Sequence, residues 1–170
     1  NTKQKANLYY QINDANRVYA GITATESSNL SNNDNITNIT DFNSNIYTLK
    51  YQYQTLQNEN KIFKTKTNLN LEIGVGSRNT SVKKTKQSIL NLTGNHIFNL
   101  NQTNSIYLKT IIQRLESDNY FENELYRFGG INTIRGFTEN SLTANSVNIL
   151  ISEYRYRLSE GLFVNSVLDY

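Results

Sequence analysis

Residues 62 to 76 read Ile-Phe-Lys-Thr-Lys-Thr-Asn-Leu-Asn-Leu-Glu-Ile-Gly-Val-Gly, and their alternation is the strongest structural signal in the chain. One face of this segment is apolar, and it carries Phe63, Leu69, Leu71, Ile73 and Val75. The opposite face is polar or small. Successive side chains of a β-strand point to opposite sides of the sheet, so a period of two residues predicts a strand.

The same alternation recurs along the chain, whereas helical spacing is nearly absent. It predicts an all-β fold with eight strands in sequence, compatible with up-and-down antiparallel pairing. The predicted strands are centred on Leu8–Ile12, Val18–Ala24, Ile46–Thr55, Ile62–Gly76, Ser88–Leu100, Ser105–Leu115, Val147–Leu158 and Leu162–Tyr170. Short turns are predicted at Asn13–Asn16, Asn101–Asn104 and Ser159–Gly161, and long loops at Asn29–Phe42 and Asp118–Asn145.

The length of the strands indicates their surroundings. Strands in soluble domains are usually about 5 to 6 residues long, whereas a tilted strand that crosses a membrane needs roughly 9 to 11. Most segments here fit the longer class, and the chain has 12 Tyr, which suits the membrane boundary. We therefore expect an antiparallel transmembrane β-barrel with its apolar face toward lipid. A soluble ligand-binding barrel, with the apolar face buried inside, is the alternative from another class.

Composition argues against several other functions. The net charge is +3, but Lys and Arg are spread along the chain, so we expect no nucleic-acid partner. The chain has no Cys and a single His, His96, which falls on an apolar strand face. Without a second metal ligand or a nucleophile beside a base, we expect no enzyme activity, no metal and no cofactor.

A glycine-rich segment interrupts the alternating pattern and reads Arg-Phe-Gly-Gly-Ile-Asn-Thr-Ile-Arg-Gly-Phe from Arg127 to Phe137. Its glycines permit a tight turn that presents Arg135 in a fixed direction. If the apolar faces of the last two strands point to lipid, Glu153 and Asp169 point into the lumen, together with Arg155 and Arg157. We expect the loop 118–145 to fold inward so that Arg135 pairs with both carboxylates. Inward-facing Gly74 and Gly76 are expected to leave room for it.

These residues resemble the outer-membrane protein assembly and two-partner-secretion superfamily, the BamA/TamA-like barrels. Its hallmark is a lumen loop with a Gly-Gly followed by Val/Ile-Arg-Gly-Phe/Tyr, and the motif Arg contacts acidic residues on the next two strands. The matching positions are Gly129, Gly130, Ile134, Arg135, Gly136 and Phe137, with Glu153 and Asp169 as the partners of the Arg. The resemblance is firm over about the last 45 residues of the chain. The residues before them contribute only strands that are compatible with it.

The resemblance implies a bacterial outer membrane location and a sixteen-stranded barrel of which residues 1–170 form part. The ends of the chain, one without an initiator Met and one inside a strand pattern, lead to the same expectation. The implied work is non-enzymatic insertion of outer-membrane proteins or translocation of polypeptides. The implied partners are lipids, unfolded client proteins and possible accessory lipoproteins. The second interpretation is a passive pore or a small structural barrel complete in eight strands.

Overall fold

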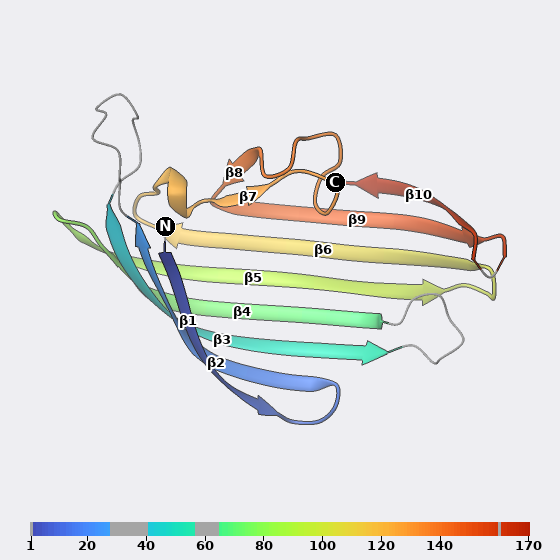
Figure 1. Cartoon of the computed structure of the whole chain (residues 1–170), viewed down its shortest axis with the longest axis horizontal. Helices are drawn as coiled ribbons and strands as arrows, with labels where there is room; N and C mark the ends of the chain where they lie inside the picture. The colour runs from blue at the N-terminus through green and yellow to red at the C-terminus, as the bar shows by residue number, and fades with distance from the viewer. Residues whose placement is uncertain (1, 28–40, 57–64, 160) are drawn as a thin grey trace.

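The computed structural model describes residues 2–27, 41–56, 65–159 and 161–170, and shows an all-β chain (Figure 1). The eight long strands form one antiparallel sheet in the order β1-β2-β3-β4-β5-β6-β9-β10. They are β1 (Thr2–Gln11), β2 (Asn16–Ser27), β3 (Phe42–Leu56), β4 (Thr65–Asn79), β5 (Lys84–Asn99), β6 (Asn104–Ser117), β9 (Ser146–Arg157) and β10 (Phe163–Asp169). The prediction of eight strands paired in up-and-down order is confirmed.

The predicted boundaries are less accurate. Strand β3 begins at Phe42, four residues before the predicted start at Ile46, because the polar residues Asn43 to Asn45 still pair with β2 and β4. The first three residues of the predicted segment 62–76 lie outside the described residues, as does most of the predicted loop 29–42. The segment 118–145 is not a plain loop. It contains a 3-10 turn (Glu122–Glu124) and the short strands β7 (Tyr126–Phe128) and β8 (Leu142–Ala144), which pair with each other.

Two tight turns at one end of the sheet use the same asparagine chemistry. In the β1–β2 turn the side-chain Oδ1 of Asn13 accepts hydrogen bonds from the backbone N–H groups of Ala15 and Asn16, at 3.0 and 2.9 Å. In the β5–β6 turn Asn101 Oδ1 accepts them from Thr103 and Asn104, at 2.9 and 2.8 Å. A side-chain oxygen that accepts hydrogen bonds from backbone N–H groups two and three residues later replaces the backbone hydrogen bonds that are missing in the turn.

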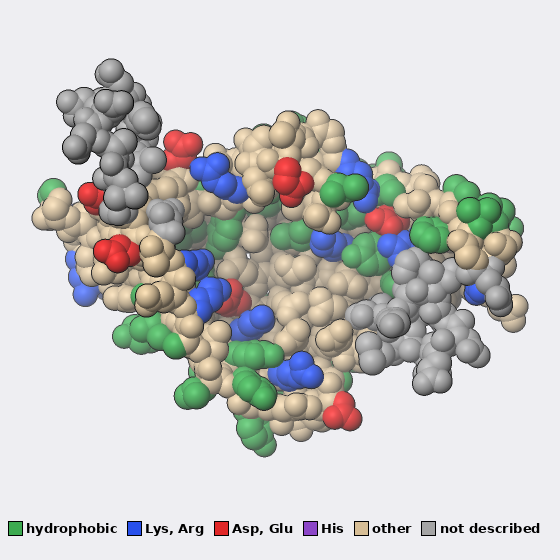
Figure 2. Space-filling view, viewed as in Figure 1, with side chains coloured by type: hydrophobic (Ala, Val, Ile, Leu, Met, Phe, Trp, Pro, Cys, Tyr) green, Lys and Arg blue, Asp and Glu red, His purple; other side chains and the backbone are tan. Residues whose placement is uncertain are grey.

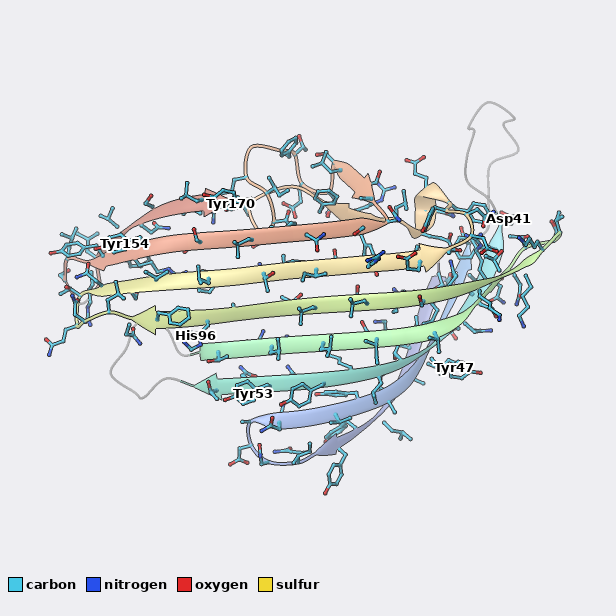
Figure 3. The ribbon with its side chains drawn as sticks, turned by 180° about the vertical axis from the view of Figure 1, so that it is seen from behind. Asp41, Tyr47, Tyr53, His96, Tyr154 and Tyr170 are labelled. Atoms are coloured by element: carbon cyan, nitrogen blue, oxygen red, sulfur yellow. The ribbon has the colours of Figure 1, made fainter. Side chains whose placement is uncertain are left out.

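Alternation along the strands produces two different faces, as the sequence predicts. In β9 the residues Val147, Ile149, Ile151 and Glu153 are buried, whereas the residues between them are exposed or half-buried. The exposed set Leu150, Tyr154 and Tyr156 lies on the outer, convex face. Figure 3, which shows the sheet from behind, labels Tyr47, Tyr53, Tyr154 and Tyr170 on β3, β9 and the end of β10.

The sheet curves into a trough but is not closed into a barrel, so β1 and β10 are its two edges within the described part of the chain (Figure 1). Gly76 belongs to this curvature. A Cβ there would collide with the carbonyl oxygen of Asn45 and lie 2.7 Å from the Cα of Ile46, both in β3. At Gly74 the nearest atoms are side chains of Ile89, Ile46 and Thr48. The expectation that these glycines leave room for the loop is wrong, because their neighbours in the sheet occupy the space.

The main apolar cluster lies on the inner face of β6 and β9, under the loop. Its buried members are Ile111, Val147, Ile149 and Ile151, and the partly buried Tyr126, Phe128, Ile134, Ala144 and Val167 pack against them. The loop thus supplies the apolar cover that the sheet alone lacks on this face. The described residues include no helix long and apolar enough to cross a membrane.

We predict that Gly76→Ala destabilises the sheet and that Gly94→Ala does not. The added methyl group at position 76 would meet the backbone of β3, whereas at position 94 its nearest neighbour is Leu69 Cδ1 at 3.3 Å, an atom that can move. Overpacking against backbone costs about 1 to 3 kcal/mol. Urea-induced loss of the β-sheet circular dichroism signal of the purified protein measures the difference. Equal unfolding midpoints for the two variants would contradict this role of Gly76.

Candidate functional site

The loop tip is a compact turn built on glycines. Gly129, Gly130 and Gly136 have φ values of 109°, 96° and 93°, a region that L side chains rarely adopt. The backbone N–H of Gly130 donates to the carbonyl oxygen of Ile134 at 3.1 Å, and that of Gly129 donates to Thr133 Oγ1 at 2.9 Å. These bonds close the turn just before Arg135 and fix the direction in which its side chain leaves the loop.

Ile134 and Phe137, the two apolar residues of the predicted motif, lie in different surroundings. Ile134 is partly buried and packs on the cluster formed by β6 and β9. Phe137 is exposed on the tip. Of these two residues, Ile134 therefore supplies the apolar contact between the tip and the sheet. The other contacts of the tip with the sheet are polar.

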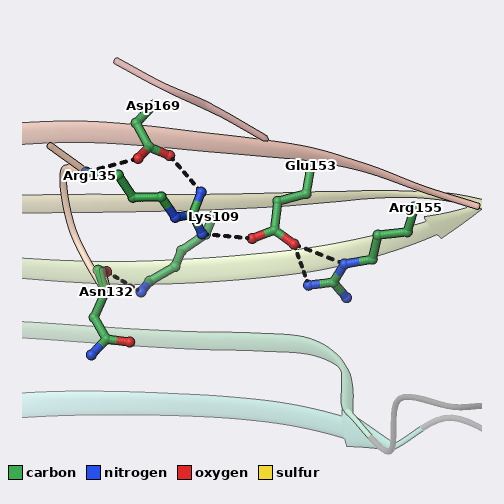
Figure 4. Close-up of polar contacts among 6 residues, drawn as sticks. All are labelled: Lys109, Asn132, Arg135, Glu153, Arg155 and Asp169. Carbon is green, nitrogen blue, oxygen red and sulfur yellow. Dashed lines mark hydrogen bonds and ion pairs between the residues drawn. The ribbon is translucent and has the colours of Figure 1, made fainter. Parts of the chain in front are cut away.

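The structure brings Arg135 next to both predicted carboxylates (Figure 4). Its Nη1 donates to Asp169 Oδ1 and its Nη2 to Glu153 Oε1, each at 3.3 Å. Its backbone N–H also donates to Asp169 Oδ2 at 3.0 Å. Asp169 thus holds both the side chain and the backbone of the tip. The Arg135 side chain is 38% exposed and both carboxylate side chains are 10% exposed.

Neighbouring cations complete this group of charges. Arg155 donates from Nε and Nη2 to Glu153 Oε2 at 2.9 and 2.7 Å, and its guanidinium lies 4.4 Å from the ring centroid of Tyr107. Lys109 Nζ donates to the carbonyl oxygen of Asn132 at 2.9 Å, which adds a second hold on the tip. Arg157 does not join the group, since its Nε donates to the carbonyl oxygen of Ser159. Glu153 is therefore paired with Arg155 and Arg135.

A second ion pair, which the sequence interpretation missed, holds the start of the loop. Arg78 on β4 pairs through Nη1 with Glu124, and their side chains are 1% and 7% exposed. The Arg78 guanidinium lies 3.9 Å from the ring centroid of Phe121 and donates to both oxygens of Asn119. Gln87 Nε2 donates to the other carboxylate oxygen of Glu124 at 2.9 Å. The stretch 119–124 is thereby fixed to the inner face of β4 and β5.

The alternation of inward and outward residues in β4 contained a sequence signal for this ion pair. The even-numbered residues of β4 point inward, and continuing that parity past Gly74 and Gly76 places Arg78 inside as well. A guanidinium stays charged under all ordinary conditions, so an inward arginine requires a carboxylate. Three residues of the stretch 116–124 could have supplied it besides Glu124, namely Glu116, Asp118 and Glu122. Parity alone does not choose among them.

A cavity of about 420 Å³ with a mixed polar and apolar lining lies between the loop and the inner face of the sheet. Lys3 and Lys5 from β1 and Glu72 from β4 line it, opposite Tyr126 and Arg127 of the loop. Figure 2 shows Lys and Arg side chains near Asp and Glu side chains around the hollow in the middle of the molecule. Burial raises the pKa of Tyr126 to about 12, and the Glu72 carboxylate adds to the rise, while a hydrogen bond with Asn91 acts in the other direction.

Comparisons with protein-family models, with curated proteins and with solved structures find no match to this chain. Among the described residues no group of three or more His, Cys, Asp or Glu side chains could hold a metal ion. The site described above is thus a loop fixed inside a curved sheet by two sets of charge pairs. Its chemistry is the recognition of guanidinium groups by carboxylates.

We predict that the Tyr126 hydroxyl titrates near pH 12 in the folded protein. The phenolate absorbance of Tyr126→Phe subtracted from that of the parent protein isolates this group. In guanidinium chloride the same difference should titrate near 10, the ordinary value. Because the folded pKa lies above the unfolded one, the group's contribution to stability is complete below pH 10 and is lost as the pH rises through 12. A folded difference curve centred near 10 would contradict the buried position of the hydroxyl.

Proposed function

We propose that this chain forms part of a bacterial outer-membrane β-barrel that inserts outer-membrane proteins or translocates polypeptides, without covalent catalysis. The observation that carries the proposal is the loop tip on the inner face, where Arg135 meets Glu153 and Asp169 on the two strands that follow it. The Gly129-Gly130 and Ile134-Arg135-Gly136-Phe137 sequence around it resembles the lumen-loop motif of the BamA/TamA-like barrels. Lipids and unfolded client proteins are the proposed partners, with accessory lipoproteins as possible additions.

The outer face supports a position in lipid. From Leu90 on β5 to Leu100 just past its end, the outward residues are mostly apolar, while Lys84 and Lys86 precede them. The ten steps from Leu90 to Leu100, at about 3.3 Å each and tilted by about 45°, span roughly 23 Å along the membrane normal, close to the apolar band of about 25 Å in outer-membrane barrels. Tyr47 and Tyr53 stand near the two ends of the outer apolar face of β3, as in an aromatic girdle (Figure 3).

The tilt follows from the register. The outward apolar residues begin at Val75 in β4, at Leu90 in β5, at Ile112 in β6 and at Leu150 in β9. In the register Val75 pairs with Ser88, Leu90 with Arg114 and Ile112 with Asn148, so the start of the apolar band moves by two residues from each of these strands to the next. Between β3 and β4 it does not move, because Tyr47 pairs with Val75. The mean over these four steps is about 1.5 residues, or roughly 5 Å for strands about 4.8 Å apart, which corresponds to a tilt of roughly 45°. Strands of outer-membrane barrels tilt by about 35 to 45°.

The inner face supports a role for the loop in the lumen. It carries charged and polar side chains among apolar ones at the cavity, and the apolar cluster under the tip. A loop held there narrows the interior and gives it a fixed shape. The proposed function needs this shape for client passage, and the charge pairs of Arg135 maintain it.

We predict that Arg135→Ala reduces the amount of folded outer-membrane client proteins, or of secreted client, several-fold. The change removes two charge-assisted contacts, each worth roughly 1 kcal/mol for a guanidinium that is partly exposed. Quantitative proteomics of isolated outer membranes, at matched levels of the variant protein, measures the effect. Arg157→Ala is the matched control, because Arg157 is an arginine of β9 whose Nε donates to the carbonyl oxygen of Ser159 and which does not join the charge group at the tip.

Two results would count against the proposal. An unchanged outer-membrane proteome and unchanged secretion in Arg135→Ala would remove the role in client insertion or translocation. Ion conductance of the purified protein in planar bilayers, together with that unchanged proteome, would favour the passive pore instead.

A further inference from the structure

Two cations hold the inner loop, and they hold different parts of it. Arg78 binds the loop root, defined here as residues 118–125, through Glu124 and Asn119. Arg135 binds the loop tip, defined as residues 129–141, to Glu153 and Asp169. The paired strands β7 and β8 lie between root and tip and close the loop at its neck.

The root contact is buried on both sides, whereas the tip contact is buried only on the side of its carboxylates. Arg78 and Glu124 are 1% and 7% exposed; at the tip Glu153 and Asp169 are each 10% exposed, but Arg135 is 38% exposed. Arg78 also packs against Phe121, whose ring lies 6.0 Å from that of Phe42 in β3. Removing one partner of a buried pair leaves an uncompensated charge, while a partly exposed arginine regains water when it leaves its partners. The two contacts therefore differ strongly in how readily they open.

One of the two carboxylates at the tip, Glu153, keeps a partner when Arg135 leaves. Glu153 Oε2 accepts two hydrogen bonds from Arg155, at 2.9 and 2.7 Å, and Arg135 uses the other oxygen at 3.3 Å. When the tip opens, Glu153 remains paired, while Asp169 loses its contacts with the Arg135 side chain and backbone. At the root, Asn123 Nδ2 donates to Ser27 Oγ at 2.7 Å, which adds a tie to β2 that the tip does not share.

We propose that Arg78 is the positioning residue of a hinged loop, in which the root stays anchored to β4 while the tip with Arg135 opens and closes. The anchor keeps the tip next to Glu153 and Asp169 at high local concentration, so that each opening is followed by return to the same site. This inference rests on the proposed function in one respect, the purpose of the opening: a polypeptide segment is admitted while the loop stays in the lumen.

The test uses site-specific spin labels, since residues 1–170 contain no Cys that would be labelled as well. Glu122→Cys reports the root, Asn132→Cys reports the tip, and Gln102→Cys in the β5–β6 turn reports the sheet; all three side chains are exposed. Each reporter is combined with Arg78→Met or Arg135→Ala. The mobile fraction of the electron paramagnetic resonance spectrum is then measured on the purified protein in detergent.

The proposal expects an asymmetric result. Arg135→Ala should raise the mobile fraction at position 132 by at least about twofold and leave position 122 unchanged, because local opening spreads only as far as the next anchor. Arg78→Met should raise it at both positions. Position 102 should not respond to either variant. A rise at 122 in Arg135→Ala, or an ordered tip in Arg78→Met, would overturn the hinge.

Two further variants guard against misinterpretation. If Arg78→Met does not fold, Glu124→Gln decides by the same criterion, since it keeps the guanidinium on Phe121 and removes only the opposite charge. Lys83→Met is the matched control: Lys83 pairs with Asp118 at 3.4 Å at the same root, but the two side chains are 64% and 70% exposed. It should leave both reporters unchanged, because exposed pairs contribute little. The spectra are recorded without client protein, so they test the hinge independently of the proteome measured for Arg135→Ala.

Discussion

A guanidinium inside a β-sheet structure keeps its charge, and this requirement determines where the inner loop can lie. Arg78 and Arg135 both point to the concave side, and each meets carboxylates that come from another part of the chain. Apolar packing of Ile134 on β6 and β9 adds contact area, but such packing has no strong direction. Bonds to carboxylates do have direction. The position of the loop is therefore fixed by charge pairing at two places and only supported by apolar contact.

The curvature of the sheet makes this arrangement possible. Where β3 and β4 bend, Gly76 lets the two backbones approach, and the strands beyond it turn toward the loop. Lys3 and Lys5 of β1 thereby face the same cavity as Tyr126 of the loop, although β1 and β6, the strand that leads into the loop, are far apart in the sheet order. A flat sheet would leave the loop with one wall. In the trough it has two, and its root and tip are held by β4 on one side and by β9 and β10 on the other.

The strands and the direction of Glu153 and Asp169 could be predicted from sequence because both depend on a period of two residues, which is local. The contact between Arg78 and Glu124 joins residues 46 positions apart, and its choice among several carboxylates depends on how the loop folds. The error about Gly74 and Gly76 has a related cause. Parity gives the side to which a glycine faces, but curvature decides whether a neighbouring strand already fills that space. The pair β7–β8 was missed because three-residue strands are too short to show alternation.

The unequal burial of the two contacts follows from where each cation lies. Arg78 stands near the end of β4, where the loop root and Phe121 cover it. Arg135 stands at the loop tip, and its side chain is 38% exposed although those of Glu153 and Asp169 are 10% exposed. Water competes for a partly exposed guanidinium, so the net contribution of its ion pairs is smaller. The site that carries the motif is thus the weaker of the two contacts. In the proposed barrel this weakness is useful, because a loop that must let a polypeptide pass should be firmly held at the place it does not open.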